Sequence, residues 1–192
     1  MGRRIHKHSL ASDLLRLFGA GAILAAVLVA PNIGIALHPF LKRADFQTER
    51  EWRRAKVKQA LERLRKRRLV QFVEKGKRTY IEITELGKQR LQEFEFDALQ
   101  LSPPKRWDGK WRLAIFDIPE KYKRERETLR RKLADLGFQQ LQRSVWVYPF
   151  DCRDEIDFVC GFLGISHWVH YLETLSIDSA EGKMRRHFDL LV

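Results

Sequence analysis

In the C-terminal half of the chain, some segments have hydrophobic residues at every second position, as strands do. Other segments have them at every third or fourth position, as helices do. KWRLAIFDI is predicted as a strand, and the next segment as a helix that keeps Leu129, Leu133 and Leu136 on one face. FQQLQ and SVWVYPF predict two strands, DCRDEIDFVCGFLG a second helix and HWVHYLETLSI a last strand. This β-α-β-β-α-β order predicts a ferredoxin-like split βαβ domain over residues 110–192.

Residues 46–100 follow a different pattern, in which a basic helix precedes a hairpin. TEREWRRAKVKQALERLRKRRLV opens with Thr48 and Glu51, a capping box. Its apolar stripe consists of Val57, Ala60, Leu61 and Leu64. VQFVEKGKRTYIEI predicts two strands around a KGK turn, and TELGKQRLQEF a further helix that starts at Thr84. This order indicates a winged helix-turn-helix, so the chain is predicted to be an α+β protein with two domains.

Two segments flank the predicted winged-helix domain. Residues 101–109, LSPPKRWDG, contain paired prolines and a glycine and are predicted to be a linker. Residues 1–45 are predicted to be an apolar N-terminal helical segment, and residues 17–37 within them carry no charge over a length that could span a bilayer. Pro31 instead favours a helix from about Ser12 to Ala30 that stops there. Both a buried helix of the winged-helix domain and a membrane anchor remain open.

The charge of the chain is unevenly distributed. The formal net charge is +12, and residues 1–106 hold 23 Lys and Arg against 11 Asp and Glu, whereas residues 107–192 hold 14 against 14. An excess of positive charge confined to the N-terminal half favours a polyanionic partner for that half. Cys152 and Cys160 would lie about 12 Å apart on a helix, too far for a disulfide. Two reduced thiols favour a cytoplasmic protein, with membrane association as the alternative.

Polar and basic side chains gather on the face of the basic helix opposite its apolar stripe, and again at the hairpin tip. The predicted DNA-binding residues are Lys56, Gln59, Arg63 and Lys66 on the helix and Lys75, Lys77 and Arg78 on the hairpin. A duplex offers a major groove to the helix face and phosphates to the hairpin. A merely solvated charged face is the alternative, but the clustering of positive charge favours double-stranded DNA as the partner.

Two segments of the chain resemble a known family. KWRLAIFDIPEKYKRERETLRRKLADLGFQQLQRSVWVYP resembles the central domain of PaaX-like transcriptional regulators, a domain that is similar to the CRISPR adaptation nuclease family Cas2. ALERLRKRRLVQFVEKGKRTYIEITELGK resembles the winged-helix half of the same regulators. The resemblance covers roughly residues 50–178 and implies a cytoplasmic repressor that forms a homodimer through the ferredoxin-like domain. The Trp- and Tyr-rich strands favour a second copy covering the free face of the sheet.

Asp117 lies in the motif FDIP, at the end of the first predicted strand of the C-terminal domain. It is the candidate for a catalytic or metal-binding residue. In the nuclease family an Asp at this position, one from each subunit, is thought to hold a divalent metal, so the resemblance implies a catalytic and metal-binding role with Mg²⁺ or Mn²⁺. Only Glu120 is near enough in sequence to help, and capping of the helix that begins near Pro119 is the simpler interpretation of Asp117. The sequence therefore favours a regulator without a cofactor over a metal-dependent endonuclease or a structural partner of a CRISPR integrase.

Overall fold

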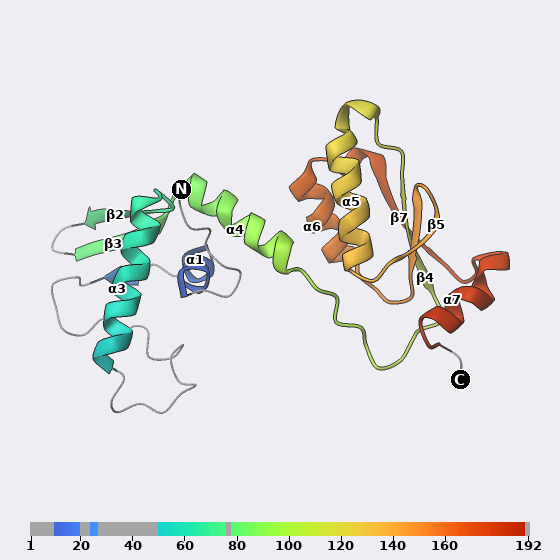
Figure 1. Ribbon diagram of the computed structural model, residues 1–192, viewed down its shortest axis with the longest axis horizontal. Coiled ribbons are helices and arrows are strands. Elements are labelled where there is room, and N and C mark those ends of the chain that lie inside the picture. Colours follow the sequence, from blue (N-terminus) through green and yellow to red (C-terminus); the bar gives the residue numbers. More distant parts are fainter. Residues whose placement is uncertain (1–9, 20–23, 27–49, 76–77, 191–192) are drawn as a thin grey trace. The chain divides into compact units, whose positions relative to one another are not determined.

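The computed structural model describes residues 10–19, 24–26, 50–75 and 78–190, and the side chains of 10–19, 56–74 and 80–190. The chain divides into two compact units, residues 1–98 and residues 99–192. Both units combine helices with sheets, as Figure 1 shows, which confirms the predicted α+β class.

The N-terminal unit packs helices against a three-stranded sheet. Its described elements are α1 (Leu10–Gly19), β1 (Leu24–Ala26), α3 (Arg50–Lys66), β2 (Val70–Lys75), β3 (Arg78–Ile83) and α4 (Glu85–Ala98). The sheet has the order β1-β3-β2, and both pairs are antiparallel. The predicted apolar stripe of α3 is confirmed, because Val57, Ala60, Leu61 and Leu64 are all buried in a core shared with α1 and α4.

The N-terminal segment differs from its prediction. The helix expected from about Ser12 to Ala30 ends at Gly19, and Leu24–Ala26 form strand β1 against β3. A continuous apolar run has no periodicity that separates a helix from a strand, so the pairing with β3 decides its structure. Within the described residues no helix is long and apolar enough to cross a membrane, and most of the suggested span, residues 17–37, lies outside them.

The joint between α3, β2 and α4 fixes the position of α3. The predicted helix start at Thr84 is confirmed, because its hydroxyl accepts the backbone N–H of Gly87 at 3.0 Å. The same hydroxyl donates to the carbonyl oxygen of Arg68 at 2.6 Å, where the chain turns out of α3 with a positive φ of 57°. A Cβ on Gly87 would lie 2.0 Å from the carbonyl oxygen of Leu69. Only glycine lets α4 begin this close to the end of α3.

The C-terminal unit has the predicted order of strands and helices. Its elements are β4 (Trp111–Phe116), η1 (Glu120–Tyr122), α5 (Lys123–Asp135), β5 (Gln139–Gln142), β6 (Val145–Tyr148), α6 (Arg153–Leu163), η2 (Ser166–Trp168), β7 (Val169–Thr174), η3 (Asp178–Ala180) and α7 (Glu181–His187). The sheet order β5-β6-β4-β7, antiparallel throughout, is that of a ferredoxin-like split βαβ domain. Helices α5 and α6 lie side by side on one face of this sheet (Figure 1).

The second face of this sheet is covered in part by the chain's own C-terminal residues. Met184 of α7 packs against Trp111 and Val147, and all three are buried. Helix α7 was not predicted, because its seven residues carry no apolar stripe long enough to separate it from a loop. The part of this face that α7 leaves uncovered includes Leu113 and Leu172, so the bare face expected from the sequence is partly covered.

Candidate nucleic-acid interface

Helix α3 presents a polar and basic face to solvent. The side chains of Lys56, Gln59, Arg63 and Lys66 are exposed, whereas the stripe on the other side of the helix is buried. Spacings of three and four residues place them in one row along the helix. From Lys56 to Lys66 the row is about 15 Å long, enough to follow a few base pairs of a major groove.

Two arginines of α3 that are two residues apart, Arg63 and Arg65, have different surroundings. Arg65 pairs with Glu62 at 3.6 Å, and its guanidinium lies 5.4 Å from the centre of the Phe72 ring. The protein itself therefore holds Arg65. In the described part of the chain, the side chains of Arg63 and Lys66 make no ion pair, so their charges face solvent. Arg63 and Lys66 are the cations of α3 best placed to meet a phosphate or a base.

The hairpin predicted as a wing is present in the backbone. Strands β2 and β3 pair in register from Val70 opposite Ile83 to Lys75 opposite Arg78, which confirms the hairpin itself. The side chains of Lys75, Lys77 and Arg78 lie outside the described residues, so their phosphate contacts stay a prediction.

Asp117 follows β4 and has an exposed side chain, and its backbone N–H donates to the carbonyl oxygen of Trp168 at 3.1 Å. The predicted cap is wrong. Pro119 precedes η1 in an extended conformation, and neither η1 nor α5 has a hydrogen bond from a capping side chain. The extended Pro119 separates the carboxylate of Asp117 from the first helical N–H groups.

Asp117 does not fit a complete metal site within one chain. The carboxylate of Glu120 is paired with Arg126 at 2.7 Å and with Lys123 at 3.6 Å, and the hydrogen bond from Arg126 lowers the pKa of Glu120. Among the residues that the structure describes, no three His, Cys, Asp or Glu side chains come together to hold a metal ion. Because Mg²⁺ prefers several oxygen ligands, a metal at Asp117 would need ligands from outside this chain.

A buried arginine that the sequence did not single out fastens the linker to the C-terminal unit. Arg112 is 4% exposed and makes two hydrogen bonds of 2.6 Å to the carboxylate of Asp108. It also donates to the carbonyl oxygens of Lys110 at 2.8 Å and Pro149 at 3.0 Å. These bonds hold the pKa of Asp108 at about 2, below its usual value, and raise that of Arg112. An Asp four residues before an Arg is unremarkable outside a helix, so nothing in the sequence marks the pair.

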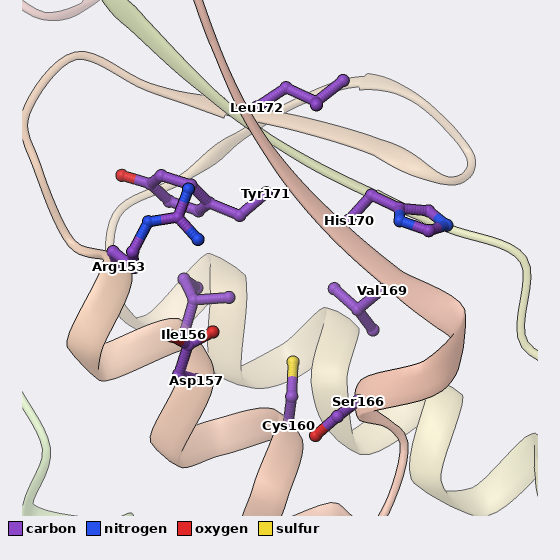
Figure 2. Close-up of a pocket in the computed structure, with 9 residues that line it drawn as sticks. All are labelled: Arg153, Ile156, Asp157, Cys160, Ser166, Val169, His170, Tyr171 and Leu172. Carbon is purple, nitrogen blue, oxygen red and sulfur yellow. The ribbon is translucent and has the colours of Figure 1, made fainter.

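A pocket of about 200 Å³ lies between α6 and β7. Figure 2 shows the thiol of Cys160 and the side chain of Val169 at its base, with Arg153 beside Tyr171. Burial raises the pKa of Cys160 to about 12, so its thiol stays protonated at neutral pH and is a poor nucleophile. The pocket is therefore lined by polar and apolar side chains together, and Cys160 supplies no covalent chemistry in it.

One comparison with known families bears on the C-terminal unit. Residues 104–185 match the sequence model of the PaaX protein central Cas2-like domain. The match takes in all four strands of the C-terminal sheet together with α5 and α6. Among curated proteins, none matches the chain. Residues 104–185, which contain the ferredoxin-like sheet, are therefore similar to PaaX-type, Cas2-like domains.

Proposed function

We propose that the protein is a transcriptional regulator of the PaaX type, a dimeric repressor whose N-terminal unit binds double-stranded DNA through α3. The observation that carries the proposal is the exposed row of Lys56, Gln59, Arg63 and Lys66 on a helix whose opposite side is buried. The order α3, β2, β3, with β1 on the outer side of β3, supports a winged helix. In such folds the helix before the hairpin enters the major groove.

The residues of α3 suit different parts of a duplex. The guanidinium of Arg63 can donate two hydrogen bonds to a guanine, and the amide of Gln59 can pair with an adenine. The lysines Lys56 and Lys66 suit phosphates, which fix orientation but carry no sequence information. Lys75, Lys77 and Arg78 at the hairpin would add phosphate contacts beyond the groove.

The C-terminal unit supports the regulatory part of the proposal. Its PaaX-type, Cas2-like domain has a strip of sheet on which a second copy can pack, and a dimer would present two copies of α3 to two half-sites. Cys152 and Cys160 are both free and buried, which favours a reducing compartment such as the cytoplasm.

The test is the affinity of the full chain for a short mixed-sequence duplex. We expect the double variant Arg63→Ala/Lys66→Ala to bind at least about tenfold more weakly than the wild type, because a base contact and a phosphate contact are lost together. The control is Arg124→Ala/Arg131→Ala, which removes the same amount of charge from the exposed side of α5. Equal losses in both double variants, or no loss in either, would reject α3 as the DNA-binding element.

A further inference from the structure

The pocket between α6 and β7 is lined by polar side chains whose bonding capacity the fold does not use. Four of its lining residues are polar and exposed, namely Arg153, Asp157, Ser166 and His170. In the part of the chain that the structure describes, none of these four side chains forms an ion pair or a hydrogen bond. A pocket in which a few such groups converge beside apolar side chains has the usual build of a small-molecule site.

Arg153 is held in place at this pocket without being neutralised. Its guanidinium lies 4.5 Å from the centre of the Tyr171 ring. The ring is itself fixed, because the hydroxyl of Tyr171 donates to the carboxylate of Asp151 at 3.1 Å and accepts the backbone N–H of Cys152 at 3.3 Å. The contact with the ring uses none of the hydrogen bonds of the guanidinium, so Arg153 can still donate two of them to a carboxylate.

Asp157 supplies the opposite charge on the same helix. It follows Arg153 by four residues on α6, a spacing that places Cβ atoms about 5–6 Å apart and allows an ion pair. The guanidinium of Arg153 lies over Tyr171 instead, and both charged groups line the pocket separately. A ligand with a single charge would meet one of them and be repelled by the other. A ligand that carries a carboxylate and an ammonium group close together would complement both.

The pocket floor suits a small aliphatic group. Ile156 and Cys160 of α6 are buried, and Val169 of β7 lies across from them (Figure 2). Burial raises the pKa of the Cys160 thiol to about 12, so this floor is uncharged at neutral pH. The volume of about 200 Å³ equals the share of about seven water molecules in the liquid, which is the size of a small aliphatic molecule.

We propose that this pocket binds a free α-amino acid with an aliphatic side chain of the size of leucine. The carboxylate of the ligand accepts hydrogen bonds from Arg153, its ammonium group donates to Asp157, and its side chain packs on the pocket floor. All of these residues belong to the C-terminal unit, so the proposal goes beyond the DNA-binding function and does not depend on it.

Calorimetric titration of the full chain with L-leucine tests the site. The matched ligands are isocaproate, which is leucine without its ammonium group, and isoamylamine, which is leucine without its carboxylate. We expect leucine to bind saturably and each analogue to bind at least about tenfold more weakly, because a hydrogen bond to a charged group is lost. Absence of saturable binding with leucine, isoleucine, valine and methionine would overturn the proposal. An affinity for isocaproate equal to that for leucine would overturn it as well.

Substitutions at the pocket give a readout that non-specific binding would not give. Asp157→Asn should weaken the binding of leucine about tenfold and should not weaken that of isocaproate, which lacks the group that meets Asp157. Arg153→Gln should weaken the binding of both ligands. The matched controls are Asp154→Asn and Arg143→Gln, at exposed residues that do not line the pocket, and both should bind leucine as the wild type does. Equal losses in pocket and control variants would overturn the assignment of the two charged residues.

The double variant Arg63→Ala/Lys66→Ala separates this proposal from the proposed function. It should lose duplex binding and keep the affinity of the wild type for leucine. A wild-type chain that binds leucine and no duplex would reject the DNA-binding function and support the amino-acid site. Duplex binding that depends on Arg63 and Lys66, in a chain that binds none of the four amino acids, would reject the amino-acid site and leave the DNA-binding function standing.

Discussion

Helix α3 of the N-terminal unit and two arginines of the C-terminal unit, Arg112 and Arg126, show two different uses of basic side chains. On α3, Arg63 and Lys66 are exposed and make no ion pair within the described part of the chain. In the C-terminal unit, Arg112 is buried against the carboxylate of Asp108, and Arg126 is paired with Glu120. Cations that face solvent are available to a partner, whereas cations paired with the protein's own carboxylates hold its fold. Total charge alone would not separate these two uses.

The distribution of charge follows the same division. Residues 1–106 carry 23 Lys and Arg against 11 Asp and Glu, and residues 107–192 carry 14 against 14. In the balanced part, carboxylates stand beside the arginines that they neutralise, as Glu181 does for Arg185 at 2.7 Å. The lesson is that the exposed Arg63 and Lys66 of α3, more than the overall basicity of the chain, mark the site proposed for nucleic acid.

If the two units fold independently, the largest expected effect is the loss of stability of one unit when a leucine of its core is truncated. Leu64 of α3 and Leu133 of α5 are both fully buried, each in its own unit. Replacing either by alanine should cost that unit about 2–5 kcal/mol of unfolding free energy. Hydrogen exchange of the separate segments measures both at once. We expect Leu64→Ala to lower protection only in residues 1–98 and Leu133→Ala only in residues 99–192. Loss of protection in both units from one substitution would show that they fold as a single cooperative body.

Replacing one glycine in each unit by alanine should change stability by a smaller amount, in opposite directions for the two units. The Cβ of Gly87→Ala would meet the carbonyl oxygen of Leu69 at 2.0 Å, so this variant should destabilise the N-terminal unit by about 1–3 kcal/mol. Gly161, within α6, has nothing within 4 Å of such a Cβ. Gly161→Ala should stabilise the C-terminal unit by up to about 1 kcal/mol, because alanine is the better helix former. Denaturant unfolding of both variants checks the signs, and a stabilising Gly87→Ala would contradict the close approach of α4 to the end of α3.

The smallest expected effect is the pH-dependent contribution of the Asp108–Arg112 ion pair to stability. The pKa of Asp108 is lowered from 3.8 to about 2 by Arg112, so the folded state favours the ionised carboxylate. The stability that this pair contributes is fully present above pH 3.8 and is lost as the pH falls through 2. Asp108 is half exposed, which limits the contribution to about 1 kcal/mol. Asp108→Asn should therefore be less stable than the wild type at neutral pH, and the difference in unfolding free energy should shrink toward zero as the pH falls through 2. A difference that is the same at both pH values would contradict the account.

Local patterns in the sequence predicted most of the fold because periodicity and turn signals are strong there. The four strands and two long helices of the C-terminal unit follow alternating or helical apolar spacing, and Thr84 marks the start of α4 by a capping side chain. Strand β1 and helix α7 were missed, because one lies in a continuous apolar run and the other in seven mostly polar residues. Both depend on tertiary pairing, with β3 and with Trp111 respectively, that no local pattern encodes.

The candidate site was predictable only in part. The exposed row on α3 follows from helical periodicity, since the side opposite a buried stripe has to face solvent. The roles of Asp117 and Arg112 depended on contacts between distant segments. The backbone of Asp117 bonds to Trp168, and Arg112 joins the linker to Pro149. Neither partner can be inferred from the residues adjacent in sequence.

The central claim, that the exposed cations of α3 bind duplex DNA, is tested most directly by the salt dependence of binding. Each phosphate contact releases bound counterions, so the logarithm of the binding constant should fall linearly with the logarithm of salt concentration, with a slope of about −0.9 for every contact. We predict a steep slope for the wild-type chain on a short duplex, and a slope shallower by about 1 in Lys66→Ala. A binding constant that does not change with salt, or a Lys66→Ala slope equal to that of the wild type, would contradict the claim.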